Sequence, residues 1–293
     1  MPRCPRPNRP RRERKQTTAR IARNRLLRAE HLEDRRLLAV SFELNFLGGN
    51  TVGFNDPVLG ADYQSAMESA ASRLGNEILH DATIELNVTS EPFNGTNIAS
   101  ATSDVGPVVP GGGFVHRVVP SKIIGEGDLN GSEVDGNVEV FFFSGSDPYT
   151  YVTDPAEADG TGEIDFQAVI QHELVHMLGF TSNTKSNGTD DAGNGVITPG
   201  TWAPYDRFVS DLNGNRFINT DTNSPFVYQM NTTQWNAHST GGSGPNAGLF
   251  FDGPIATAVY GDRVPLYSPD VFSLASSVSH LDSENYPGEG YQF

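Results

Sequence analysis

Residues 172–180 read His-Glu-Leu-Val-His-Met-Leu-Gly-Phe, and this stretch decides the fold that the sequence predicts. On a helix, His172 and His176 lie one turn apart on the same face. Two neutral imidazoles at this spacing can bind one zinc ion. Glu173 follows the first histidine, so its carboxylate projects beside the ion, where it can take a proton from water. The pattern therefore predicts metal-assisted hydrolysis.

The flanking residues favour a helix through this motif. Gly160, Gly162 and Asp165 predict a loop followed by an N-cap. The apolar side chains that follow at helical spacing are Phe166, Val169, Ile170, Leu174 and Met177. Gly179 then stands where a chain that leaves a helix needs a residue tolerant of positive φ. The alternative is an amphipathic core helix whose two histidines bind nothing.

A catalytic zinc site needs a third protein ligand and one open position. A histidine three residues after Gly179 would complete a compact motif, but residue 182 is a serine. Two histidines remain downstream, His238 and His280. Weaker candidates are the aspartates Asp190, Asp191 and Asp206. The residues alone leave these alternatives open.

The stretch at 172–180 resembles the active-site helix of leishmanolysin-type zinc metalloproteases and their secreted bacterial relatives, in which the third histidine is distant. Residues 276–282, Ser-Ser-Val-Ser-His-Leu-Asp, are similar to the distal Ser-His motif of that family, and the segments 205–208 and 266–269 also resemble its bacterial members. The resemblance covers roughly residues 41 to 293. It implies a zinc-dependent endopeptidase in which His172, His176 and His280 bind Zn2+ and Glu173 is the general base.

One feature departs from this family. The resemblance implies a methionine turn beneath the metal, soon after His280, but the methionines of this chain are Met1, Met67, Met177 and Met230. Three explanations follow: the chain is truncated, another residue forms the floor of the site, or His280 is not the ligand. A lost methionine turn also keeps open a catalytically dead binding module on the same scaffold.

The hydrophobic patterns outline an α+β fold. Alternating apolar residues predict strands at 40–46, 83–89, 114–119 and 137–143, and helical spacing predicts a helix over 61–78 before the metal-motif helix. This order resembles the upper lobe of a zincin, a twisted mixed sheet with two helices on one face. We therefore expect an upper lobe over about 41–180 and an irregular, loop-rich lower lobe over about 181–293.

A zincin-like cleft between these lobes would bind a peptide or protein substrate along a sheet-edge strand. Residues 138–143, Val-Glu-Val-Phe-Phe-Phe, are the candidate for a strand near that cleft, and a buried core strand is the alternative interpretation.

Charge is distributed unevenly along the chain. Residues 1–36 hold 13 of the 20 Lys and Arg residues and four acidic residues, which leaves 7 basic and 32 acidic residues in the remainder. The strongly acidic segment that follows residue 36 repels nucleic acid and anionic lipid. No apolar run in the sequence reaches the length of a membrane span. Residues 31–39, His-Leu-Glu-Asp-Arg-Arg-Leu-Leu-Ala, resemble the export leader of many planctomycete proteins. We therefore expect residues 1–40 to be an export leader, disordered or removed, and the protein to be secreted or at the cell surface, a monomer by default.

Residues 157–166 resemble a calcium-binding loop, with Gly162 and Ile164 in register. However, residue 157 is Glu where aspartate is usual, and Ala168 stands where a bidentate glutamate is needed. We interpret the segment as the turn before the metal-motif helix and keep Ca2+ as a second candidate cofactor. A calcium-stabilised surface protein with incidental histidines is thus a further alternative. The single cysteine, Cys4, lies in a peptide similar to the zinc-capping peptide of matrix metalloproteases, which we interpret as coincidence.

Overall fold

The structure is a computed structural model that describes residues 38–49, 51–95, 97–104, 109–158, 161–241 and 248–282. All of these belong to one compact unit, Leu37–Phe293. The predicted leader, except for its last three residues, lies outside the described part of the chain, and so does Cys4.

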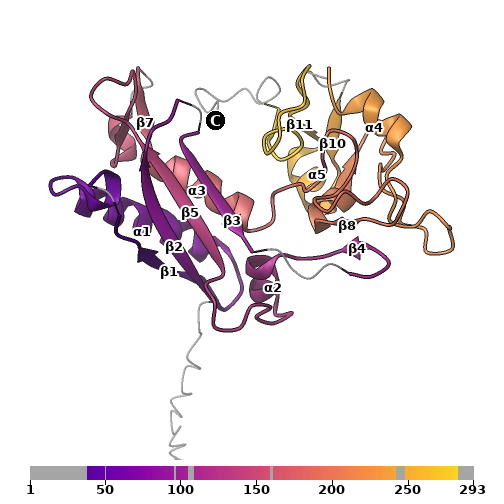
Figure 1. Cartoon of the computed structure of the whole chain (residues 1–293), viewed down its shortest axis with the longest axis horizontal. Coiled ribbons are helices and arrows are strands. Elements are labelled where there is room, and N and C mark those ends of the chain that lie inside the picture. The colour runs from indigo at the N-terminus through magenta and orange to yellow at the C-terminus, as the bar shows by residue number, and fades with distance from the viewer. Residues whose placement is uncertain are drawn as a thin grey trace, which may run out of the picture. The chain divides into compact units, whose positions relative to one another are not determined.

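A four-stranded mixed sheet forms the frame of the N-terminal half. Its strands are β1 (Val40–Phe46), β2 (Ala82–Pro92), β5 (Gly136–Phe142) and β3 (Ala99–Ser103), in the spatial order β1-β2-β5-β3. β1, β2 and β5 run parallel, and β3 pairs antiparallel with β5 at the sheet edge (Figure 1). The inner strands β2 and β5 carry β-branched and aromatic residues, which favour the strand conformation.

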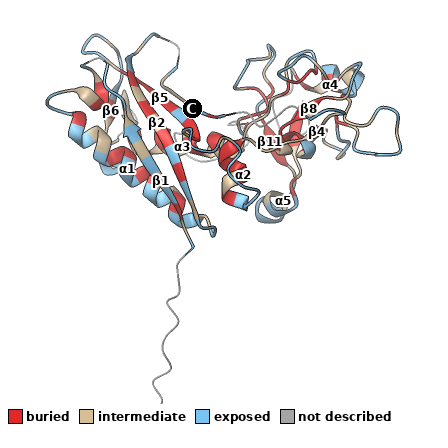
Figure 2. Cartoon of the chain, turned by 60° about the horizontal axis from the view of Figure 1, so that its bottom comes forward, coloured by how far each residue is buried: buried red, intermediate tan, exposed pale blue. Residues whose placement is uncertain are grey.

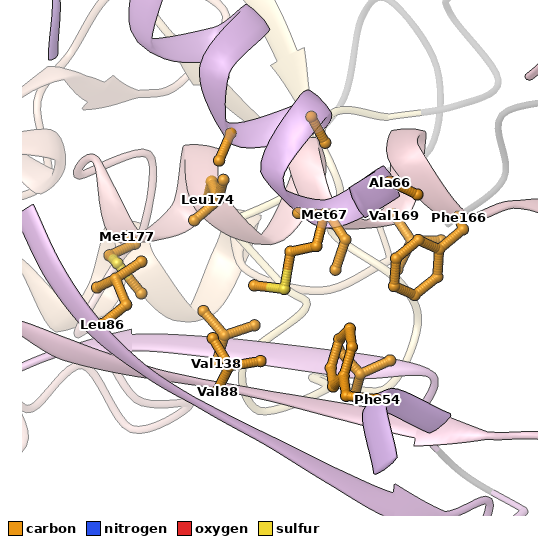
Figure 3. Close-up of a cluster of buried hydrophobic side chains, with 14 of the residues drawn as sticks. Phe54, Ala66, Met67, Leu86, Val88, Val138, Phe166, Val169, Leu174 and Met177 are labelled. Atoms are coloured by element: carbon orange, nitrogen blue, oxygen red, sulfur yellow. The ribbon is translucent and has the colours of Figure 1, made fainter. Parts of the chain in front are cut away.

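Two helices, α1 (Gly60–Glu77) and α3 (Phe166–Met177), pack side by side on one face of this sheet. Figure 3 shows their apolar side chains above those of β2 and β5, with Met67 of α1 pointing towards Val88 and Val138. Ile84, Leu86 and Val88 of β2 are completely buried in this core. α3 is therefore anchored by its apolar stripe, and its remaining faces are left for the site.

The aromatic end of the core is built around Phe166, the first residue of α3. Its ring lies between 5.2 and 6.0 Å from the rings of Phe54, Tyr63, Phe142 and Tyr151. Such clusters of tilted and edge-on rings stabilise a core beyond the area that they bury. They fix the N-terminal end of α3 against the sheet.

In the described residues of 181–282, namely 181–241 and 248–282, the elements are all short. These are β8 (Thr201–Trp202), η3 (Pro204–Phe208), β9 (Val209–Ser210), α4 (Thr232–His238), β10 (Leu249–Phe251), α5 (Pro254–Tyr260) and β11 (Val264–Leu266). β9, β10 and β11 form an antiparallel sheet over a second core around Trp202, Trp235 and Leu249. α5, by contrast, has no buried residue (Figure 2).

The remaining short elements connect these parts. They are η1 (Gly53–Asn55), β4 (Gly113–Phe114), α2 (Val118–Ile124), β6 (Thr150–Val152), η2 (Pro155–Glu157) and β7 (Glu163–Asp165). β4 pairs in parallel with β8, and this pairing joins a segment before α2 to the second core. β6 pairs in parallel with β7, which leads directly into α3.

The α+β class is confirmed, as are the strands near 40–46, 83–89 and 137–143 and the helix near 61–78. The predicted strand at 114–119 is wrong, because β4 ends at Phe114 and α2 begins at Val118. The segment 138–143 is not an edge strand either: β5 lies between β2 and β3, as the core-strand interpretation held. The two edge strands are β1 and β3, and the sequence patterns predicted no strand at Ala99–Ser103. No helix among the described residues is long and apolar enough to cross a membrane.

Candidate metal centre

α3 begins and ends through local hydrogen bonds that the sequence encodes. The carboxylate of Asp165 accepts a hydrogen bond from the backbone N–H of Ala168 at 3.1 Å, so the predicted N-cap is confirmed. At the other end, Gly179 has φ +108°, and its N–H donates to His176 O while the N–H of Phe180 donates to Val175 O. This pattern is a Schellman motif, which a glycine makes possible without strain.

Three histidine rings converge beside α3. His172 Nε2 and His176 Nε2 lie 3.0 Å apart, and His280 Nε2 lies 3.1 Å from the first and 3.2 Å from the second. All three residues are partly buried. The structure thus brings His280 to the helical pair across more than a hundred residues of chain. Among the described residues, no other group of His, Cys, Asp or Glu side chains is close enough to hold a metal ion.

The hydrogen bonds of the Nδ1 atoms orient two of the three rings, those of His176 and His280. His176 Nδ1 lies 2.7 Å from Phe180 O, and His280 Nδ1 lies 2.9 Å from Ser276 O. A carbonyl oxygen only accepts, so each Nδ1 carries the hydrogen, and in a neutral ring Nε2 then has only a lone pair. Lone pairs that face each other at about 3 Å repel, and a cation between them turns this repulsion into attraction.

The pKa values of His172 and His176 also favour neutral rings. Burial lowers the pKa of His172 to about 4, with further lowering by His176 and His280. Burial also lowers the pKa of His176, although its bond to Phe180 O acts in the opposite direction. Neutral imidazoles are the form that binds metals. Nitrogens at about 2.0–2.1 Å from a tetrahedral zinc ion lie about 3.3 Å apart, close to the spacing of the three Nε2 atoms, so these residues fit zinc.

Glu173 lies beside this cluster. Burial raises the pKa of its carboxyl to about 7, and a hydrogen bond from the backbone N–H of Ala101 in β3 lowers it in part. Helix geometry places its side chain about 60° around the helix axis from that of His176, and its hydrogen bond from Ala101 puts the carboxylate beside β3, which α3 contacts. A carboxyl in such surroundings can exchange protons near neutral pH.

His280 reaches the cluster from an ordered loop after β11. The N–H of Tyr267 donates to His280 O, and the N–H of Val278 donates to Tyr267 O. The hydroxyl of Ser279 accepts from the backbone N–H of Ser182, at 3.0 Å. These bonds attach the loop to β11 on one side and to the segment after α3 on the other.

The alternative third ligands lie elsewhere. The ring of His238, at the end of α4, packs on Phe217 with 6.0 Å between the ring centroids. Asp190 accepts hydrogen bonds from the backbone of Asn194 and Thr201, and Asp191 pairs with Arg117.

Asp206 is buried and accepts hydrogen bonds from Ser182, Asn183 and Ala203. Burial raises its pKa to about 6 despite these donors. It therefore supports the segment after α3 and does not belong to the cluster.

The predicted calcium loop at 157–166 is described only in part, because residues 159 and 160 lie outside the described residues. Within it, Glu163–Asp165 form β7 and the carboxylate of Asp165 is engaged as the helix cap. The helix cap expected in this segment is therefore confirmed, but residues 163–165 form the strand β7 and not a turn.

Several groups at the site were missed by sequence reasoning. They include the N–H of Ala101 and the carbonyls of Phe180 and Ser276, and backbone groups leave no signature in residue type. A cavity of about 310 Å3 beneath the end of α3 is lined by Leu178, Gly179 and Trp202, among others, but by none of the three clustered histidines. Comparison of the chain with protein-family profiles, curated proteins and solved structures finds no match.

Proposed function

We propose that the protein is a zinc-dependent endopeptidase with a zincin-like arrangement, an upper lobe over about 41–180 and a lower lobe over about 181–293. The observation that carries the proposal is the convergence of three Nε2 atoms within 3.2 Å of one another. His172, His176 and His280 would hold the ion. Three histidine ligands leave a fourth position open, which distinguishes catalytic from structural zinc sites.

The chemistry divides between the ion and the residues around it. A bound zinc ion supplies Lewis acidity, which eases the deprotonation of water and stabilises negative charge on a carbonyl oxygen. Glu173 takes the proton of the attacking water and later delivers it to the nitrogen of the leaving amine. The hydrogen bond from Ala101 N–H orients the carboxylate for both transfers.

The substrate would lie along the outer edge of β3. The N–H of Phe141 donates to Ile98 O, and Ala99 pairs with Val140, so alternation directs the backbone groups of Ala99 and Ala101 away from β5. The N–H of Ala101 is bonded to Glu173, which leaves the N–H and C=O of Ala99 and the C=O of Ala101 for a peptide. An extended peptide that adds to this edge gains main-chain hydrogen bonds. Because α3 contacts β3, the peptide would pass close to Glu173.

Export is part of this proposal. We propose that residues 1–40 direct the chain out of the cytoplasm and that the acidic body acts as a secreted or cell-surface enzyme on peptides or proteins. A fusion of residues 1–40 to a reporter should be exported by a host of the matching type, and a reporter found only in the cytosol would contradict this point.

The test is the substitution Glu173→Gln, with zinc content and casein cleavage measured on the same preparation. We expect retained zinc and a fall in cleavage of about 10²–10⁴-fold, the usual contribution of general acid–base catalysis. Retained zinc with unchanged cleavage refutes the role of Glu173. A wild-type chain that binds zinc but cleaves nothing is instead a catalytically dead binding module, and one that binds only Ca2+ is a calcium-stabilised surface protein.

A further inference from the structure

Val278, two residues before His280, has an unusual backbone. Its φ is +71°, and its side chain is completely buried. A β-branched residue at positive φ is an outlier, because its side chain clashes with its own backbone. Such a conformation persists only where the surroundings impose it, and strained residues of this kind gather at functional sites. Contacts from neighbouring residues must therefore hold Val278 in this conformation.

Tyr205, in η3, supplies the most direct of these contacts. Its buried hydroxyl donates a 2.8 Å hydrogen bond to Val278 O, while the N–H of Val278 is bonded to Tyr267 O. Both backbone polar groups of Val278 are thus held from opposite sides. A left-handed residue whose N–H and C=O are both engaged cannot rotate to a relaxed conformation without breaking a buried hydrogen bond.

The ring of Tyr205 is itself held on two sides. It stacks on Phe251 at 4.8 Å between centroids with 20° between the planes, and it meets Phe180 edge-on at 5.0 Å. Phe180 also provides the carbonyl that accepts from His176 Nδ1. One aromatic group, Phe180–Tyr205–Phe251, is therefore linked to two of the three clustered histidines.

We propose that Tyr205 is a positioning residue of the metal centre: its hydroxyl holds Val278 in the left-handed conformation, and this directs His280 towards His172 and His176. The inference rests on the proposed zinc site and goes beyond it by naming what completes that site. Residues that orient metal ligands without touching the metal commonly change affinity by about 10–100-fold.

The test compares Tyr205→Phe with Tyr151→Phe, with zinc affinity measured by chelator competition on the full chain. The two changes are matched, because the hydroxyl of Tyr151 also donates a 2.8 Å hydrogen bond to a backbone carbonyl, that of Ile98, but in the first core. We expect Tyr205→Phe to weaken zinc binding by about 10–100-fold and Tyr151→Phe to leave it unchanged. Equal zinc affinity in the two variants overturns the inference.

A second measurement repeats Tyr205→Phe in a Val278→Gly background. Glycine adopts positive φ readily, so the segment needs the tyrosine hydroxyl less, and the same substitution should cost a smaller factor in zinc affinity. An equal loss in both backgrounds overturns the assigned route through Val278. A wild-type chain that binds no zinc refutes the proposed function and the inference with it, whereas wild-type binding no tighter than that of Tyr205→Phe refutes the inference alone.

Discussion

The free energy of unfolding of the metal-free chain should depend on pH through Asp206. Burial raises the pKa of this carboxyl from 3.8 to about 6. A carboxyl whose pKa is higher in the folded chain stabilises the fold when it is protonated. Its contribution is therefore complete below pH 3.8 and is lost as the pH rises through about 6. At about 1.36 kcal/mol for each pKa unit, the full contribution is about 3 kcal/mol.

The substitution Asp206→Asn isolates this contribution. The amide oxygen can still accept from the N–H groups of Asn183 and Ala203, and the amide nitrogen can donate to the hydroxyl of Ser182, so the hydrogen-bonded segment keeps its partners. The variant does not titrate. Between about pH 4 and pH 7, the wild type should therefore lose about 2–3 kcal/mol relative to the variant.

Urea denaturation at a series of pH values measures this difference directly. A chelator is present throughout, because a bound metal would add a pH dependence of its own. The stability of the wild type should fall relative to that of the variant as the pH rises, whatever the intrinsic cost of the amide, so the two curves must not run parallel. Parallel curves from pH 4 to pH 7 would show that Asp206 has an ordinary pKa and would refute the reasoning from burial.

Three further predictions concern the metal centre and its helix. His280→Ala should weaken zinc binding by about 10²–10³-fold, because a binding free energy of about 10–16 kcal/mol is shared among four ligands in structural zinc sites. His238→Ala should leave zinc binding unchanged, and equilibrium dialysis that gives the reverse order would assign the third ligand to His238. Gly179→Ala should destabilise the chain by about 1–2 kcal/mol in urea denaturation, because its φ is +108°, and no loss of stability would mean that the turn is not strained by a side chain. Asp165→Ala should cost about 1 kcal/mol through the lost N-cap, and Asp165→Asn, which keeps an acceptor, should cost less; equal costs would contradict the cap.

The sequence predicts those parts of the fold in which side-chain pattern and burial agree. β2 shows this well, since Ile84, Leu86 and Val88 alternate with polar residues and are completely buried. The bounds of α3 can also be predicted from the sequence, because Asp165 caps its start and Gly179 allows the turn at its end. In these elements the local signal and the long-range packing point the same way.

The edge strand β3 could not be predicted in this way. Its residues are Ala-Ser-Ala-Thr-Ser, without a large apolar side chain, and it exists as a strand because β5 offers it a hydrogen-bonding edge. The segment 114–119 failed for the opposite reason. Its apolar residues suggested a strand, but Val118 and Val119 begin α2, where tertiary packing overrides the weak preference of valine for strands.

The residues of the candidate site that lie on one helix could be predicted from the sequence, whereas those brought in from distant segments could not. His172, Glu173 and His176 follow from the spacing of one helix. The placing of His280 depended on a resemblance, because nothing in its local sequence states which distant residue it meets. The role of Tyr205 could not be predicted, because its contact with Val278 depends on how residues 181–282 fold. The carbonyl partners of the histidine rings could not be predicted either, because backbone atoms leave no signature in residue type.

Anomalous diffraction at the zinc edge, from crystals of the full chain grown with zinc, tests the central claim most directly. We predict a single strong peak at about 2.0–2.1 Å from Nε2 of His172, His176 and His280, with an open position on the side of Glu173. A peak elsewhere, or no peak while the three rings keep their positions, would contradict a metal centre at this place.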